Sequence, residues 1–178
     1  MFTLRLDDIP SDGLNLNWTE EKSSLSTYLE SFSQIDFGFE GPLRSEARVW
    51  KAGQSVFING RVQTTLQLQC VRCLKEFSYP IASTFELTLL PLKETPSSEE
   101  TELGEEDMES TFYQGGEIHL SEIACEQIFL EIPLKPLCQE DCKGLCPTCG
   151  KDLNLGPCEC VREEFASGFS TLKKLKLD

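Results

Sequence analysis

The sequence predicts a mainly β protein of the α+β class: an antiparallel β-meander or barrel-like domain with two short helices and a cysteine-rich C-terminal segment. Alternating apolar and polar residues run almost unbroken from residue 43 to residue 90, which is the period of half-buried strands. Apolar residues at helical spacing occur in only two short stretches. Eight of the nine cysteines fall into four close pairs, three of them after residue 135.

The first forty residues predict a strand, a helix and a second strand. Residues 2–6 alternate as a strand does. Residues 19–31 begin with a threonine and two acids and carry Leu25 and Leu29 at helical spacing, which predicts a short helix. Alternation resumes over residues 35–39 and indicates another strand.

Residues 43–90 predict the meander itself. One parity of the first strand carries Arg44, Glu46, Arg48 and Trp50, and residues 52–54 form the turn. The next strand alternates from Val56 and runs directly into Cys70. A third strand follows Cys73, so this cysteine pair should lie at the tip of a hairpin, where a metal would fix the strand register.

The acidic stretch 94–110 predicts a solvated loop, because residues 94–109 hold eight acids and no lysine or arginine. An acidic decoy that competes for a basic partner is the alternative. Residues 112–118 indicate a strand or hairpin, and Ser121 should cap a helix that ends before Pro133. His119 is expected at the surface, and Cys125 as a buried free thiol inside that helix.

Composition limits the compartment. No apolar run approaches the ~20 residues of a membrane span, and residues 1–8 lack the pattern of a secretory signal. Nine cysteines cannot all pair within one chain. We therefore expect the reducing cytoplasm, where paired thiols indicate metal or redox chemistry.

The cysteine pairs predict two structural zinc sites, because thiolate suits Zn²⁺ and a structural site takes four ligands. The set closest in sequence is Cys146, Cys149, Cys158 and Cys160. The set that remains is Cys70, Cys73, Cys138 and Cys142. This second set would join the hairpin tip to the tail, and an interleaved allocation stays open. The expected divisions are a domain at 1–135, a zinc-binding segment at 136–162 packed on that tip, and a tail at 163–178.

The charge pattern suggests one RNA-binding surface. A net charge of −14 disfavours binding of nucleic acid by bulk charge. Residues 41–75 nevertheless hold six bases and one acid, and Arg44, Arg48 and Arg61 share the outer face with Trp50. Guanidinium groups and an exposed aromatic ring can contact phosphate and stack on a base. The alternative is an ordinary solvated sheet face.

The sequence does not predict an enzyme. It has no nucleophile–base pair, phosphate loop or dinucleotide fingerprint. Thiolates would fill both metal sites, whereas a catalytic zinc needs an open position. The alternative class is a thiol redox or metal-handling protein that uses Cys70 and Cys73 as a reactive dithiol.

The order of these features resembles the YceD family of large ribosomal RNA subunit accumulation proteins. The resemblance is carried by Cys70-x-x-Cys73, by Glu131-Ile132-Pro133-Leu134, and by the run Pro-Leu-Cys-x-x-Asp-Cys-Lys-Gly-Leu-Cys-Pro-x-Cys-Gly over residues 136–150. It implies a cytoplasmic, non-enzymatic factor needed for accumulation or processing of large-subunit ribosomal RNA. The expected partners are the precursor of that RNA, a basic ribosomal protein, or both; no membrane or small-molecule substrate is expected.

Overall fold

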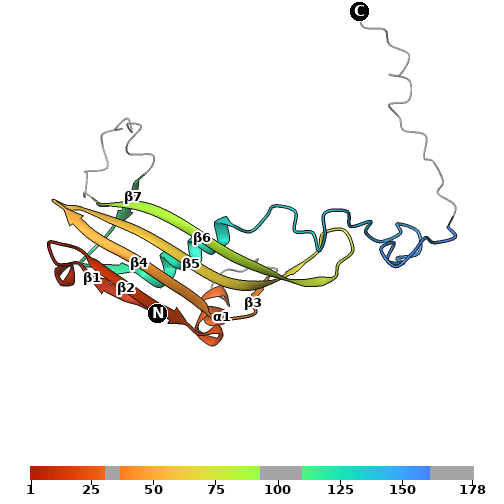
Figure 1. Cartoon of the computed structure of the whole chain (residues 1–178), viewed down its shortest axis with the longest axis horizontal. Helices are drawn as coiled ribbons and strands as arrows, with labels where there is room; N and C mark the ends of the chain where they lie inside the picture. Colours follow the sequence, from red (N-terminus) through yellow and green to blue (C-terminus); the bar gives the residue numbers. More distant parts are fainter. Residues whose placement is uncertain (31–36, 93–109, 161–178) are drawn as a thin grey trace, which may run out of the picture.

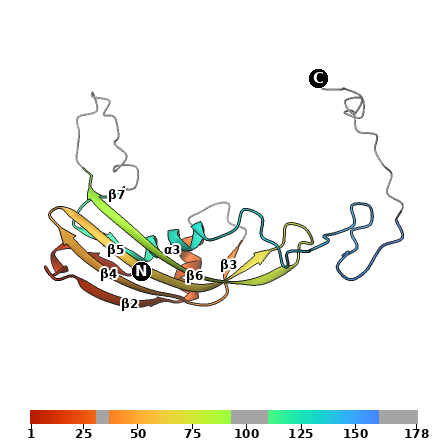
Figure 2. The ribbon, with the colours of Figure 1, turned by 45° about the horizontal axis from the view of Figure 1, so that its top comes forward.

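A long, curved, six-stranded sheet dominates the structure (Figures 1 and 2). The computed structural model describes residues 1–30, 37–92 and 110–160. The strand order is β2-β4-β5-β6-β7, with β3 also paired to β5. The strands are β2 (Leu14–Glu20), β3 (Gly38–Phe39), β4 (Leu43–Ala52), β5 (Ser55–Gln69), β6 (Glu76–Pro91) and β7 (Ser110–Tyr113).

The antiparallel pairing of β4, β5 and β6 confirms the predicted meander and the fold class. Buried and exposed residues alternate along these strands as the sequence pattern indicates. Over the part of the chain that the structure describes, the sheet is open, with β2 and β7 at its edges, so the expected barrel-like closure is not seen. Its last pairing, β6 with β7, is parallel.

A smaller layer covers one face of this sheet. Strand β1 (Thr3–Arg5) pairs antiparallel with β8 (Glu117–His119), and a 3-10 turn η1 (Leu6–Asp8) follows β1. The helices are α1 (Lys22–Glu30) and α3 (Leu120–Leu130), and α3 lies on the concave side of the sheet (Figure 2). Neither helix of the described ranges has the length and apolar composition of a transmembrane segment.

The core lies between α3 and the inner face of the sheet. Val62 and Leu66 of β5 are fully buried, as are Ala124 and Ile128 of α3. Cys125 is also fully buried and belongs to neither cysteine cluster described below, as predicted for a free thiol. Burial, with the nearby carboxylates of Glu20 and Glu122, raises its pKa to about 12.

Strand β2 is absent from the sequence prediction. Thr19 and Glu20 end this strand, and the helix begins only at Lys22. The Glu20 side chain is buried, because the Phe2 amide (3.1 Å) and the Ser121 hydroxyl both donate hydrogen bonds to it. Glu20, which resembles part of a helix start, is therefore part of a buried polar contact, whereas Glu21 is exposed and directly precedes the helix.

Four other local predictions need correction. The prediction of a strand or hairpin at residues 112–118 is correct for strands, since β7 and β8 lie there, but they do not form a hairpin, because β7 pairs with β6 and β8 pairs with β1. Ser121 is not the helix cap: it lies inside the first turn, and its hydroxyl is used by Glu20 and the Phe2 amide. The first strand ends at Arg5 because Leu6 enters η1. Of the strand predicted at 35–39, only Gly38–Phe39 is seen, and residues 35–36 lie outside the described ranges.

We expect Gly60→Ala to destabilise the sheet. Gly60 of β5 lies opposite Phe85 of β6, and a Cβ at Gly60 would be 2.4 Å from the ring atom Cζ. Overpacking of this kind costs about 1–3 kcal/mol, measurable by urea denaturation. The control is Gly116→Ala, where a Cβ meets no atom within 4 Å. Equal losses of unfolding free energy in Gly60→Ala and Gly116→Ala would show that the contact with the Phe85 ring does not constrain position 60.

Candidate metal centres and nucleic-acid interface

The Cys70–Cys73 turn closes the β5–β6 hairpin. The pairing of Gln69 with Glu76 is the last of the ladder. The Cys70 amide then donates to the Lys75 carbonyl, and the Leu74 amide donates to the Cys70 carbonyl, both at 2.9 Å. Leu74 has φ +60, so the chain folds back sharply and presents both sulfurs on the same side of the tip.

The Cys146–Cys149 turn repeats this geometry. The Cys146 amide donates to the Lys151 carbonyl (2.8 Å), and the Gly150 amide donates to the Cys146 carbonyl (2.9 Å). Gly150, with φ +72, occupies the position that Leu74 has in the first turn. Glycine takes this conformation without steric cost.

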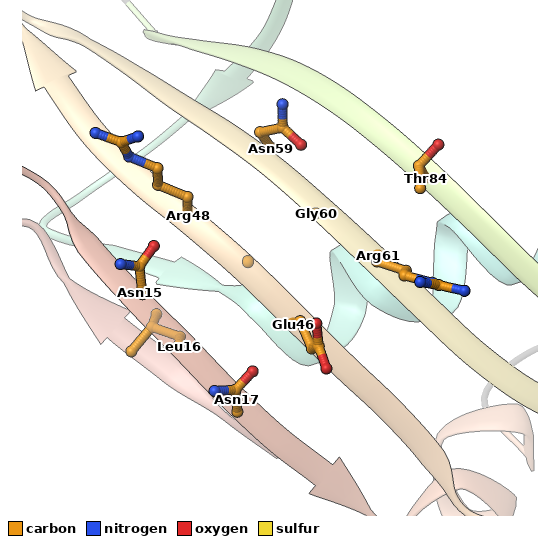
Figure 3. Close-up of a pocket in the computed structure, with 10 residues that line it drawn as sticks. Asn15, Leu16, Asn17, Glu46, Arg48, Asn59, Gly60, Arg61 and Thr84 are labelled. Carbon is orange, nitrogen blue, oxygen red and sulfur yellow. The ribbon is translucent and has the colours of Figure 1, made fainter.

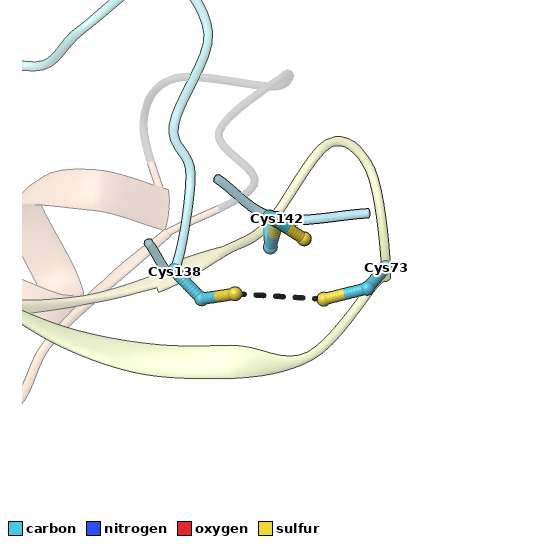
Figure 4. Close-up of side chains that lie close together, drawn as sticks. Cys73, Cys138 and Cys142 are labelled. Atoms are coloured by element: carbon cyan, nitrogen blue, oxygen red, sulfur yellow. Dashed lines mark hydrogen bonds between the residues drawn. The ribbon is translucent and has the colours of Figure 1, made fainter. Parts of the chain in front are cut away.

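The first sulfur cluster joins the hairpin tip to the C-terminal segment (Figure 4). Its four sulfurs, from Cys70, Cys73, Cys138 and Cys142, all lie within 4.8 Å of one another. The Sγ–Sγ distance is 3.7 Å between Cys70 and Cys142, and 3.6 Å between Cys73 and Cys138. Phe77, Leu137 and Leu145 pack around the cluster and shield it.

Backbone contacts hold the C-terminal segment against the tip. The Val71 amide donates to the Pro136 carbonyl (3.0 Å), and the Leu145 amide donates to the Arg72 carbonyl (3.1 Å). The Arg72 guanidinium donates to the Cys142 carbonyl (2.8 Å). Gly144 lies so close that a Cβ would be 2.9 Å from the Arg72 carbonyl oxygen, which only glycine permits.

The second cluster lies wholly within the C-terminal segment. Its sulfurs, from Cys146, Cys149, Cys158 and Cys160, also lie within 4.8 Å of one another. Cys146 is buried, whereas Cys149 is exposed. The eight sulfurs thus gather in two groups of four without interleaving: the set closest in sequence and the set that remained.

Asn154 links the two clusters. It lies between Cys149 and Cys158 of the second cluster, yet its Nδ2 donates to the Cys142 sulfur of the first (3.4 Å). Its Oδ1 accepts from the Lys143 amide (2.8 Å), and its own amide donates to Asp152 Oδ1 (2.8 Å). One side chain therefore orients a ligand of the first cluster from the loop of the second.

The backbone at both clusters favours thiolate. Burial opposes ionisation of Cys70, but amide donors, first those of Cys138 and Cys73, outweigh it and lower its pKa to about 6. The amides of Cys149 and Thr148 lower the pKa of Cys146 to about 6.

Other thiols in the clusters are disfavoured as anions. Burial and the contact with Cys73 raise the pKa of Cys138 to about 12. The contact with the Cys149 sulfur, followed by burial, raises the pKa of Cys160 to about 12. Four sulfurs this close cannot all be thiolates without a cation between them, and a divalent cation would stabilise all four.

The donor set and its spacing fit zinc. A tetrahedral site with Zn–S distances of about 2.3 Å has sulfur–sulfur edges of about 3.8 Å, close to the 3.6 and 3.7 Å observed. Four sulfurs at each cluster leave no position for a water ligand, so this geometry suits a structural rather than a catalytic ion.

The predicted RNA-contact residues lie together on the outer face of the sheet. Arg44 and Arg48 of β4 and Arg61 of β5 are exposed, and Trp50 is half-buried. The Arg48 guanidinium lies 5.9 Å from the centre of the Trp50 ring, which stacks on Phe57 at 5.4 Å. Two other bases of this window, Lys51 and Arg72, instead donate to backbone carbonyls.

The sequence reasoning missed the polar residues beside these arginines. Asn15 and Asn17 of β2 line a shallow hollow of about 330 Å³ with Arg48, Arg61 and Asn59 (Figure 3). The signal for β2 was the alternation of Leu14, Leu16 and Trp18 with polar residues. Without that strand, the two asparagines could not be placed on this face.

Comparison with models of known protein families shows which family the chain belongs to. The model of the family described as "Large ribosomal RNA subunit accumulation protein YceD" matches residues 58–176. The chain belongs to the YceD family. The match includes both cysteine clusters and confirms the resemblance drawn from the motifs.

Curated relatives of this YceD-family chain come from plants and mycobacteria. A protein of Arabidopsis thaliana named "Large ribosomal RNA subunit accumulation protein YCED homolog 1, chloroplastic" is 28% identical over 156 residues, covering 76% of this chain and 49% of that protein. The Zea mays protein of the same name is 31% identical, covering 65% of this chain and 47% of its own length. An uncharacterised protein of Mycobacterium leprae is 30% identical, and the match covers 69% of this chain and 54% of that protein. The chain spans about half the length of these relatives. No solved structure matches it.

We expect Asn154→Ala to weaken zinc retention in the zinc-loaded YceD-family chain. The change removes the donor to the Cys142 sulfur and the acceptor for the Lys143 amide. Loss of such a supporting contact typically lowers metal affinity about 10- to 100-fold. The measurement is the rate of zinc transfer to a chromogenic chelator. Gln114→Ala, at an exposed amide remote in sequence from the clusters, is the control. Equal rates of zinc transfer from the wild type and from Asn154→Ala would show that Asn154 does not support the first cluster.

Proposed function

We propose that this YceD-family chain is a non-enzymatic, zinc-binding factor in large ribosomal subunit biogenesis, which supports accumulation of large-subunit ribosomal RNA. Two clusters of four sulfurs, each set within 4.8 Å of one another, are the observation that carries the metal part of this proposal, and two edges of the first cluster measure 3.6 and 3.7 Å. The family description carries the biological part. The relatives' names refer to the same RNA.

Each zinc ion would have a structural role. The ion at Cys70, Cys73, Cys138 and Cys142 would fasten residues 136–145 to the hairpin tip; the ion at Cys146, Cys149, Cys158 and Cys160 would fold the following loop. Bound Zn²⁺ supplies a charge that keeps all four thiolates ionised. Metal binding to such sites contributes directly to folding, because the unfolded chain has no preformed site. This arrangement supports a segment at 136–162 that packs on a domain at 1–135.

The RNA contact would be made by Arg44, Arg48, Trp50 and Arg61. They share one exposed face of a protein whose net charge is −14, so phosphate would be attracted to this face rather than to the whole surface. A basic ribosomal protein that binds the acidic remainder is the alternative partner. The reducing cytoplasm is the proposed location.

We expect purified chain to contain two zinc ions, measured by elemental analysis. Cys158→Ser combined with Cys160→Ser should lower the content to one, because only the second cluster loses ligands. Cys125→Ala should keep two, since Cys125 belongs to neither cluster. A metal-free, folded protein whose Cys70 and Cys73 are alkylated rapidly would instead support the thiol redox alternative.

We expect loss of the chain from its source cells to lower the ratio of large-subunit to small-subunit ribosomal RNA. The wild-type gene should restore the ratio. Cys73→Ser should not, because it removes one sulfur of the cluster that holds the two segments together. RNA sequencing or gel quantification of both RNAs is the measurement. An unchanged ratio in cells without the chain would refute the proposed role.

A further inference from the structure

The exposed face of β2, β4 and β5 is organised in rows that cross the strands. One row holds Thr19, Arg44 and Gln63; the next holds Asn17, Glu46 and Arg61; the next holds Asn15, Arg48 and Asn59; and the last contains Trp50 and Phe57. Each of the first three rows therefore presents a guanidinium group beside amide, hydroxyl or carboxylate groups, and the last presents two aromatic rings.

Three shallow hollows connect these rows into one track along β4. The central hollow of about 330 Å³ shares Asn17, Glu46 and Arg61 with a second, of about 480 Å³, that extends to Arg44. It shares Arg48 and Asn59 with a third that reaches Trp50. The shared walls show that the track runs from Arg44 to Trp50.

The groups along the track are chemically mixed in a way that suits nucleotides. The three arginines supply the positive charge that phosphate requires. The amides of Asn15 and Asn17 carry donors and an acceptor and can pair with base edges, whereas Asn59 already donates one N–H to Glu86 Oε1 (2.8 Å) and keeps its carbonyl oxygen and its other N–H for this. Within the described residues, neither Arg44 nor Arg48 forms an ion pair with a carboxylate, so their charges are available to a ligand.

Glu46 fixes how such a ligand would lie. Its exposed carboxylate stands in the middle of the track, between Asn17 and Arg61 in the same row. A carboxylate repels phosphate and accepts hydrogen bonds from exocyclic base amines. Bases would therefore face Glu46, while phosphates would lie at the flanking arginines.

We infer that this track binds single-stranded RNA, with phosphates at Arg44, Arg48 and Arg61 and unstacked bases at the asparagines, Glu46 and Trp50. The inference rests on the proposed function and specifies the form of the RNA. An open sheet face with base-reading amides suits single strands, whose bases are free to stack and pair. A-form duplexes present mostly phosphates and 2′-hydroxyls, so the amides and the aromatic end would have no base to contact.

The test is fluorescence anisotropy of the full zinc-loaded chain with a labelled single-stranded RNA of about ten nucleotides and with the matching duplex. We expect the single strand to bind at least tenfold more tightly. Three phosphate contacts predict that log K falls against log salt with a slope of about −2. Arg48→Glu combined with Arg61→Glu should lower single-strand affinity at least tenfold.

The control has the same change in charge at another surface. Arg5→Glu combined with Lys135→Glu alters two exposed bases outside the track and should change affinity less than twofold. Equal affinity of the wild type and the Arg48/Arg61 variant would overturn the inference. Equal losses of affinity in the two double variants would also overturn it, as would binding of the duplex as tightly as the single strand. Failure of the single strand to bind, or competition by polyglutamate as strong as that by unlabelled single-stranded RNA, would do the same.

A second variant tests the role of Glu46. Glu46→Gln keeps the size of the side chain but adds an amide donor, so it should change the relative affinities for homopolymeric cytosine and uracil RNAs at least threefold. An unchanged ratio would overturn the placement of bases at Glu46. These measurements are independent of ribosomal RNA levels in cells, so failure of this inference and failure of the proposed function are distinguishable.

Discussion

The contact between residues 136–145 and the tip of the β5–β6 hairpin governs the arrangement of the C-terminal segment. The sulfur pairs that meet there are separated by 65 and 72 residues in the chain. Closing loops of this length costs conformational entropy, which a few backbone hydrogen bonds on an exposed tip offset only weakly. A metal ion held by the four sulfurs, as proposed above, would offset that cost.

The same hairpin connects the two candidate sites. Strand β5 carries Arg61 and Asn59 in its middle and ends one residue before Cys70. A one-residue slip of β5 against its neighbours would turn Arg61 into the core and Val62 to solvent. A tip held by four sulfurs opposes such a slip, so the cluster and the buried alternation together keep the outer face in register.

Charge separation on this chain is strong. The molecule has a net charge of −14, yet three arginines stand on one sheet face among neutral amides and the carboxylate of Glu46. A polyanion is repelled by most of such a surface and attracted by one part of it. An acidic protein can in this way contact RNA at a defined place while avoiding non-specific binding along its whole surface.

Local sequence patterns determined the meander, the alternation of inward and outward residues along β4–β6, and the cysteine turns. These features depend on period-2 alternation and on short-range spacing, which the sequence displays directly. Family membership followed from the motifs for the same reason. The outward direction of Arg44, Arg48 and Arg61 was predictable because each lies on a strand with strong alternation.

Tertiary structure alone decided how distant segments meet. The acids at Glu20 and Glu21 resemble a helix start, but Glu20 is buried by partners about 18 and 101 residues away, so β2 and its asparagines were not predicted. Strand β6 pairs in parallel with β7, and β1 pairs with β8. The local sequence pattern of a strand does not indicate which distant strand it pairs with. The link from Asn154 to the Cys142 sulfur likewise depends on how two loops fold over each other. The sequence therefore specified the strands and the ligands, whereas long-range packing decided which polar residues stand beside them.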